Sequence, residues 1–245
     1  MNPTLEVLKN HRSIRRFKPD PVPPAVLAAA LSAGQCAATS SFLQGVTVIR
    51  VTDRDARQRL AELAGNQAYV AAAPEFLVFC ADLHRAGRCC EMHGRTPTEG
   101  FTEQFIIATV DVAVMAQSVV VAAESLGLGA CYIGALRNAP AEVATLLKLP
   151  RQVYPVFGLC LGYPDETPQT KPRLPLEVIL KQNHYDDTND RAAIAAYDQT
   201  LRNYYRYRDK NPKQQGWSEQ MANLLGKESR PHMRAFLFDR GFEMK

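Results

Sequence analysis

The chain has 245 residues, of which 46% are hydrophobic and 22% are charged. This mix is typical of a globular protein with one sizeable or intertwined domain, and it excludes both a disordered chain and an array of three domains. The formal net charge of +4 fits an anionic ligand or partner but does not by itself indicate nucleic acid.

The first third of the chain predicts three helices and two strands. Helices are expected at 4–10, 24–37 and 55–65, and strands at 45–53 and 74–82. The helix at 24–37 opens after prolines, and the helix at 55–65 begins at an Asp and ends at a Gly. The run PEFLVFCAD, residues 74–82, is apolar over the length of a strand, which indicates a buried strand.

The centre of the chain holds an irregular segment followed by a long apolar one. Residues 84–100 are polar and irregular, so we expect a loop or a mobile flap there. Residues 101–126 are long enough to span a membrane as a helix. However, Asp111, Gln117 and Glu124 recur along this segment, and each charged group at the centre of a bilayer costs roughly 2.5–3.5 kcal/mol. We therefore predict no membrane contact, and we expect this helix to lie at a subunit interface.

The remainder of the chain continues the alternation of strands and helices. Strands are expected at 129–134 and 153–162, and helices at 139–149, 190–208, 217–229 and 233–240. This order of elements predicts an α/β or α+β fold built around one sheet.

Two features bear on the location of the protein and on metals. The N-terminal residues lack the basic start and apolar run of a secretory signal, and the six cysteines lie mostly in apolar stretches. We therefore expect a cytoplasmic protein with reduced, buried thiols. His84, Cys89, Cys90 and His93 lack the spacing of a zinc site, so we predict no bound metal.

The sequence HRSIRRFK, residues 11–18, contains four Lys or Arg residues and one His. It has three interpretations: a solvated basic turn, a nucleic-acid contact, or a phosphate site. Nucleic-acid contacts usually include interleaved aromatic or Gly residues, and only Phe17 is nearby. In a phosphate site, Arg12 and Arg15 would converge on one dianion, and Ser13 would donate a hydrogen bond to it.

Several other stretches have both a functional and an ordinary interpretation. Lys171 and Arg173 could face one anion, or they could be solvated charges in a loop stiffened by prolines. The glycines of GLGACYIGAL, residues 127–136, could admit a planar ring or serve tight packing, and their pattern is not that of a Rossmann site. The polar residues of ATSSFLQ and AGNQAYV could bind a ligand or be ordinary loop residues.

Together these stretches resemble a known family. The chain resembles the nitroreductase superfamily of FMN enzymes over nearly its whole length, and within it the subgroup of NADPH-dependent nitroreductase A and flavin reductase P. The resemblance rests on motifs that occur in the order and spacing of the subgroup: HRSIRRF, SSFLQ, GNQAYV, EFLVFCAD, YIGALRN, KPRLP, YDQTLRNYY and KESRP.

The resemblance implies a fold and an assembly. The expected fold is of the α+β class, with a mostly antiparallel sheet flanked by helices, in an intertwined homodimer that binds FMN. A single nitroreductase-type domain would span residues 1–245. A helical extension from about residue 185 would contribute to dimer contacts and to NADPH binding.

The resemblance also implies roles for individual residues. The FMN phosphate and ribityl chain would be bound by His11, Arg12, Ser13, Arg15, Lys171 and Arg173. Ser41 and Gln67 would contact the ring edge or the ribityl chain, and Tyr132, Ile133, Gly134 and Ala135 would line the ring. Members of the family often have Gly-Gly where this chain has Gly134-Ala135.

The C-terminal residues would serve the reductant and the substrate. Arg208 would grip the extra phosphate of NADPH, although without the resemblance it could equally be a solvated cation at a helix end. Lys227, Ser229 and Arg230 would edge the substrate channel.

The implied activity is a ping-pong, two-electron reduction of nitroaromatics, flavins or quinones by NADPH. The flavin would carry the chemistry, so we expect no catalytic protein nucleophile and no essential general acid. Two alternatives stay open. One is a dedicated free-flavin, quinone or chromate reductase that uses the same site. The other is a nucleic-acid-binding dimer without redox activity, although no nucleic-acid partner is expected.

Overall fold

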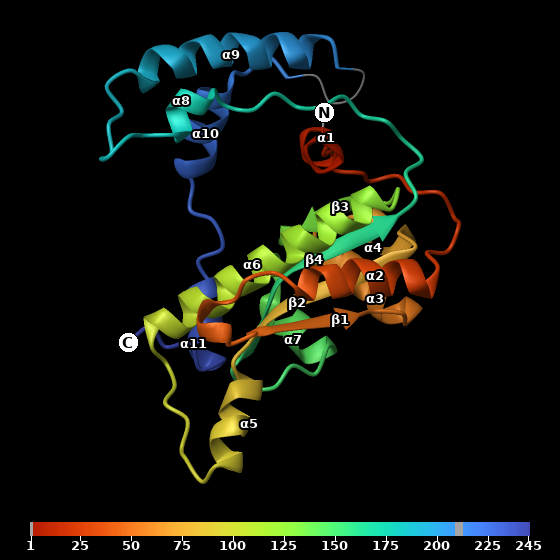
Figure 1. Ribbon diagram of the computed structural model, residues 1–245, viewed down its shortest axis with the longest axis vertical. Coiled ribbons are helices and arrows are strands. Elements are labelled where there is room, and N and C mark those ends of the chain that lie inside the picture. Colours follow the sequence, from red (N-terminus) through yellow and green to blue (C-terminus); the bar gives the residue numbers. More distant parts are fainter. Residues whose placement is uncertain (1, 209–212) are drawn as a thin grey trace. The chain divides into compact units, whose positions relative to one another are not determined.

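The computed structural model describes residues 2–208 and 213–245 (Figure 1). The chain forms two compact units. One unit comprises Met1–Pro168 together with Arg230–Lys245, and the other comprises Gln169–Ser229.

The first unit is built around a four-stranded sheet. Its strands are β1 (Val46–Arg50), β2 (Glu75–Asp82), β3 (Gly129–Ile133) and β4 (Val153–Gly162). They lie in the order β1-β2-β4-β3, and every neighbouring pair is antiparallel. The two central strands are the longest apolar runs of the four, and all residues of β2 are buried. The predicted α+β fold with an antiparallel sheet is therefore confirmed.

The helical segments of this unit surround the sheet. They are α1 (Pro3–Lys9), α2 (Pro24–Gln35), η1 (Ser40–Phe42), α3 (Arg54–Leu63), α4 (Ala68–Ala72), α5 (His84–Met92), α6 (Thr102–Ser125), η2 (Gly134–Asn138), α7 (Pro140–Leu146) and α11 (Met233–Asp239). Helix α6 contacts all four strands and also α2, so it crosses the whole sheet (Figure 1). Elsewhere in the unit, α3 contacts α4 and α7, and α7 packs on β4.

Helix α6 is the long apolar segment of the sequence. By length and composition alone it could cross a membrane, but a core helix of a soluble protein has the same properties. One side of α6 packs on the sheet, and there the Asp111 carboxylate is buried and accepts two backbone hydrogen bonds. Another side leaves Ile106, Val110 and Val114 about half exposed, at 47%, 52% and 40%.

The expected loop at residues 84–100 is wrong in its first half, because residues His84–Met92 form helix α5. This stretch contains neither Pro nor a β-branched residue, and Arg88 pairs with Glu91 one turn later at 2.8 Å. Both properties favour a helix. Its small number of apolar residues concealed the helical pattern in the sequence.

Two smaller expectations also change. Helix α3 begins at Arg54, because Asp53 is the capping residue and its Oδ1 accepts a hydrogen bond from the Ala56 N–H at 2.7 Å. Among the cysteines, Cys80, Cys131 and Cys160 are buried free thiols as expected, whereas Cys36 and Cys89 are exposed and Cys90 is half-buried.

The second unit is helical, with α8 (Leu176–Ile179), α9 (Asp190–Arg206) and α10 (Trp217–Leu225). Asp198 of α9 accepts hydrogen bonds from the backbone N–H and the hydroxyl of Ser218, at 2.8 and 2.5 Å. Gly216 lies directly against this carboxylate, where a Cβ atom would come within 2.6 Å of the Asp198 carboxyl carbon. Only glycine allows this approach, which joins α10 to α9.

Candidate functional site

The cationic run HRSIRRFK lies beside strand β3. Ser13 forms a parallel bridge with Ala130, and the Ile14 N–H donates to the Ala130 carbonyl at 2.9 Å. Gly129 permits this approach, because a Cβ there would lie 2.6 Å from the Ile14 side chain. The fold thus brings the predicted phosphate-binding segment next to the strand that carries Tyr132.

The arginines of this run differ in their partners. Arg16 pairs with Asp165 at 3.0 Å, whereas the Arg12 Nε donates to the Asn10 carbonyl at 3.2 Å. The Arg15 guanidinium lies near the Tyr69 hydroxyl and acts to lower the pKa of Tyr69. Within the described parts of the chain, neither Arg12 nor Arg15 forms an ion pair with a carboxylate. Their charges are therefore free to attract an anion.

Tyr69 links Arg15 to a second predicted site residue. Its hydroxyl donates to Gln67 Oε1 at 2.5 Å, and the Arg15 guanidinium lies near the same hydroxyl. Burial raises the pKa of Tyr69, and Arg15 opposes this rise in part. Sequence reasoning missed Tyr69, although it lies in GNQAYV, two residues after Gln67.

Glutamates fix the position of the same run. Glu166 Oε1 accepts the backbone N–H groups of Arg15 and Arg16, at 2.7 and 3.1 Å. Glu124 of α6 lies 2.7 Å from His11 Nδ1, and both side chains are largely shielded. The imidazole of His11 is thereby held in one orientation. Neither glutamate was anticipated from the sequence, because each is more than 100 residues away from its partner.

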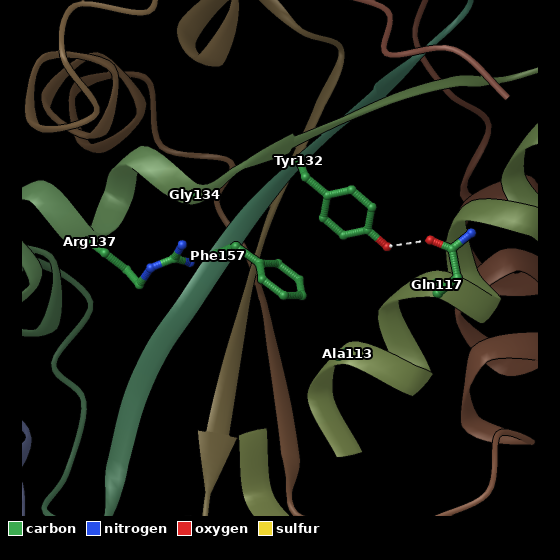
Figure 2. A pocket seen from close by; sticks show the side chains of 6 residues that line it. All are labelled: Ala113, Gln117, Tyr132, Gly134, Arg137 and Phe157. Carbon is green, nitrogen blue, oxygen red and sulfur yellow. Dashed lines mark hydrogen bonds between the residues drawn. The ribbon is translucent and has the colours of Figure 1, made fainter. Parts of the chain in front are cut away.

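A pocket of about 370 Å³ opens beside β3 (Figure 2). It is lined by Ala113, Gln117, Tyr132, Gly134, Arg137 and Phe157. The Tyr132 hydroxyl donates to Gln117 Oε1 at 3.3 Å, and the Tyr132 ring meets Phe157 edge to face, with centroids 5.0 Å apart (Figure 2). Burial raises the pKa of Tyr132, and Glu124 adds to this effect, so the phenol is neutral.

Arg137 contributes a positive charge to the lining of the pocket, and sequence reasoning missed this residue. Its Nη1 donates to the Val156 carbonyl at 2.6 Å, and its pKa is lowered by burial and then by the nearby charge of Arg230. Arg230, a predicted channel residue, donates from Nε to Asn138 Oδ1 at 2.9 Å. The structure therefore brings Arg230 close to the pocket that Tyr132 and Gly134 line.

Other predicted residues of this unit have different positions. Ile133 as a whole residue is only 1% exposed and lies in the core, and it is not among the residues that line the pocket beside β3. Ala135 is half-buried and packs against the core. Ser41 is exposed in the loop between α2 and β1, and it is not among the residues that line the pocket beside β3.

The second unit gathers its own cations around Tyr205. The ammonium groups of Lys171 and Lys213 lie 5.5 and 5.6 Å from the centre of the ring. Burial would raise the pKa of Tyr205, but a hydrogen bond with Lys171 and the charges of Lys171, Lys213 and Arg208 lower it below its usual value. Lys171 and Arg208, predicted from separate motifs, therefore share one cationic cluster.

The remaining predicted residues of this unit are exposed. Arg173 donates from Nη1 to the Lys171 carbonyl at 2.7 Å, so its side chain turns back along its own loop. Lys227 and Ser229 follow α10 and face solvent.

These features suit a flat ligand that carries phosphate. Tyr132 and Gly134 form one wall of an open pocket. Arg12 and Arg15, which pair with no carboxylate among the described residues, belong to the run beside β3. No group of three or more His, Cys, Asp or Glu side chains in the described regions is placed to hold a metal ion.

Comparisons with known proteins cover the whole chain. Residues 8–163 match the model of the nitroreductase family, and residues 171–245 match that of the nitroreductase family C-terminal domain. The chain is 44% identical over 241 residues to the NADPH-flavin oxidoreductase of Vibrio harveyi, covering 98% of both. It is 43% identical over 242 residues to the oxygen-insensitive NADPH nitroreductase of Salmonella typhimurium, covering 99% of both.

A solved structure shows the same fold. Nitroreductase A from Vibrio parahaemolyticus superposes with a TM-score of 0.93 at 44% identity, with 100% of each chain covered.

Proposed function

The chain belongs to the nitroreductase family, and from this membership we propose that it is an FMN-dependent NADPH oxidoreductase. It reduces small-molecule acceptors such as nitroaromatics, flavins and quinones by two electrons. One observation supports this proposal above all. The cationic run with Arg12 and Arg15 lies beside β3, and Tyr132 of this strand and Gly134, which follows it, line an open pocket.

The protein residues bind and orient the cofactor. Arg12, Arg15, Ser13 and His11 hold the FMN phosphate and ribityl chain, and His11 is oriented by Glu124. In this proposal Lys171 and Arg173 also contribute positive charge to the phosphate. Bound FMN would supply two-electron redox chemistry between NADPH and the acceptor, in two half-reactions.

Other residues shape the surroundings of the ring. Gln67 and Ser41 contact the ring edge or the ribityl chain, while Tyr132, Gly134, Ala135 and the Ile133 backbone line the ring. Arg137 adds a positive charge to this pocket, where it would stabilise negative charge on the reduced ring. None of these roles requires a protein nucleophile.

The C-terminal residues recognise the nucleotide. Arg208 binds the extra phosphate of NADPH, within the cationic cluster around Tyr205. Lys227, Ser229 and Arg230 edge the substrate channel. In this proposal the helical extension from about residue 185 belongs to the single domain of residues 1–245, and it contributes to dimer contacts.

The working assembly is a cytoplasmic homodimer. The half-exposed stripe of Ile106, Val110 and Val114 on α6 supports this proposal, because an apolar stripe at four-residue spacing suits a partner surface. Leu5 and Leu8 of α1, which contacts α6, are also about half exposed.

An anaerobic titration tests the function directly. The purified protein would be mixed with NADPH, and separately with NADH, while the visible absorbance of the flavin is recorded. We expect a yellow protein that NADPH bleaches quickly and NADH slowly. A colourless protein that takes up no added FMN would contradict the proposal and lead to the nucleic-acid alternative, which predicts salt-dependent DNA binding.

A further inference from the structure

The loop between α2 and β1, residues 39–45, has an unusual backbone. Ser41, Phe42 and Gln44 all have positive φ angles, of 49°, 57° and 53°. Residues other than glycine rarely adopt this region, and such conformations persist only where surrounding contacts hold them. The shape of this loop therefore depends on its neighbours.

Asp111 of α6 connects the two ends of the loop. Its Oδ1 accepts a hydrogen bond from the Ser40 N–H at 3.0 Å, and its Oδ2 accepts one from the Gly45 N–H at 3.3 Å. The residue is only 3% exposed. A buried carboxylate is costly unless its oxygens are hydrogen-bonded, so these two N–H groups are tightly held.

The Gly45 carbonyl also accepts a hydrogen bond from the Asp82 N–H of β2 at 2.9 Å, and the remaining side-chain contacts of the loop are closer to solvent. Arg85 donates from Nη1 to the carbonyls of Gln44 and Val46, at 3.2 and 3.1 Å, and the Gln44 N–H donates to Thr39 Oγ1 at 3.2 Å. These three bonds are exposed, whereas the bond from Gly45 to Asp111 is buried. Asp111 is thus the buried side chain that binds both ends of the loop.

We propose that Asp111 is a positioning residue for flavin binding, which fixes the 39–45 loop in the conformation that presents Ser41 to the flavin. This inference rests on the proposed function, because it takes Ser41 as a contact of the ring edge or the ribityl chain. A loop that is already ordered loses less conformational entropy when the ligand binds. Releasing the loop therefore weakens the binding of any ligand that carries the ring and ribityl chain, with or without phosphate.

The test compares FMN with riboflavin, which has the same ring and ribityl chain but no phosphate. Flavin-free, full-length protein would be titrated with each flavin, and binding would be followed by flavin fluorescence. Asp111→Asn keeps the shape of the side chain but turns an NH₂ group toward one of the two N–H donors. We expect the Kd of both flavins to rise by the same factor, about tenfold or more.

Thr109→Val is the matched control on the same helix. Thr109 hydrogen-bonds to Tyr154 and to the Phe105 carbonyl rather than to the loop, so this variant should lose stability without losing flavin affinity. Asp111→Ser, which retains one acceptor oxygen, replaces Asp111→Asn if the latter does not fold. Amide exchange in the flavin-free wild type gives a measurement without any variant, and we expect slow exchange at Ser40 and Gly45.

Three results would overturn the role of Asp111. They are wild-type affinity for both flavins in the Asp111 variants, a loss confined to FMN, and rapid exchange of the Ser40 and Gly45 amides in the flavin-free wild type. A wild-type protein that bound neither flavin would overturn the proposed function as well, so the two failures are distinguishable.

Discussion

Arg15 and Arg16 are adjacent, yet their side chains have different environments. Arg16 is neutralised by Asp165 at 3.0 Å, whereas Arg15 reaches the hydroxyl of Tyr69. A guanidinium without a carboxylate partner keeps its charge for an incoming phosphate. The two residues therefore provide a matched pair for testing the phosphate site.

Arg15→Ala should weaken the binding of FMN but not that of riboflavin. A charge-assisted hydrogen bond contributes about 1.5–3 kcal/mol, which corresponds to a roughly 10- to 150-fold increase in Kd. Fluorescence titration of the flavin-free protein would measure both constants, with Arg16→Ala as the control. Equal losses for FMN and riboflavin would exclude a contact between Arg15 and the phosphate.

Arg208→Ala should raise the KM for NADPH about tenfold or more and leave the KM for NADH nearly unchanged. NADH lacks the extra phosphate, so removal of a phosphate contact affects only NADPH. Steady-state kinetics with both nucleotides would measure the ratio. Arg206→Ala is the control, because Arg206 is the last residue of α9, two positions before Arg208, and its charge is not among those that lower the pKa of Tyr205. An equal rise in the KM for NADPH and for NADH would contradict a contact between Arg208 and the extra phosphate.

At the scale of elements, Tyr154 joins strand β4 to helix α6. Its ring packs against Phe105 and Phe242, and its hydroxyl forms a hydrogen bond with Thr109. The residue is 2% exposed. Burial raises the pKa of Tyr154 to about 12, and the hydrogen bond with Thr109 opposes this rise.

This raised pKa predicts a loss of stability at alkaline pH. The ordinary pKa of tyrosine is about 10, so above this value the unfolded chain releases a proton that the folded protein retains. The free energy of unfolding should then fall by up to about 1.4 kcal/mol per pH unit between pH 10 and 12 from this group alone. Tyr154→Phe removes this contribution. Urea unfolding at several pH values would measure the free energy of unfolding of both proteins. We expect the difference between the wild type and the variant to shrink above pH 10. A difference that stays constant with pH would refute the raised pKa of Tyr154.

At the scale of the whole molecule, the exposed stripe on α6 predicts self-association. Val110 lies at its centre and is 52% exposed, so Val110→Asp would place a charge in the proposed interface. We expect sedimentation to show a dimer for the wild type and a monomer for this variant at the same concentration. Met92→Asp is the control, since Met92 is 80% exposed on α5. A dimer that persists in Val110→Asp would exclude this face of α6 as the interface.

Local patterns in the sequence were enough to predict the strands of the sheet and the kinds of residue that form the candidate site. All four strands were predicted within three residues of their ends, because local pattern reveals both the continuous apolar runs of β2 and β4 and the β-branched residues of β1. The ordered motifs indicated the family, which the comparisons confirm. The clustering of cations in HRSIRRFK indicated an anion site without saying which arginine would be free.

Contacts between residues that are far apart in the sequence became visible only in the tertiary structure. Whether an arginine is available depends on partners far along the chain, and Asp165, which neutralises Arg16, lies about 150 residues away. The contacts of His11 with Glu124 and of Ser40 with Asp111 span 113 and 71 residues. Sequence patterns record local periodicity and composition, whereas such contacts arise from the packing of α6 across the sheet. For that reason Tyr69, Arg137 and Asp111 emerged as candidate site residues only once the chain was folded.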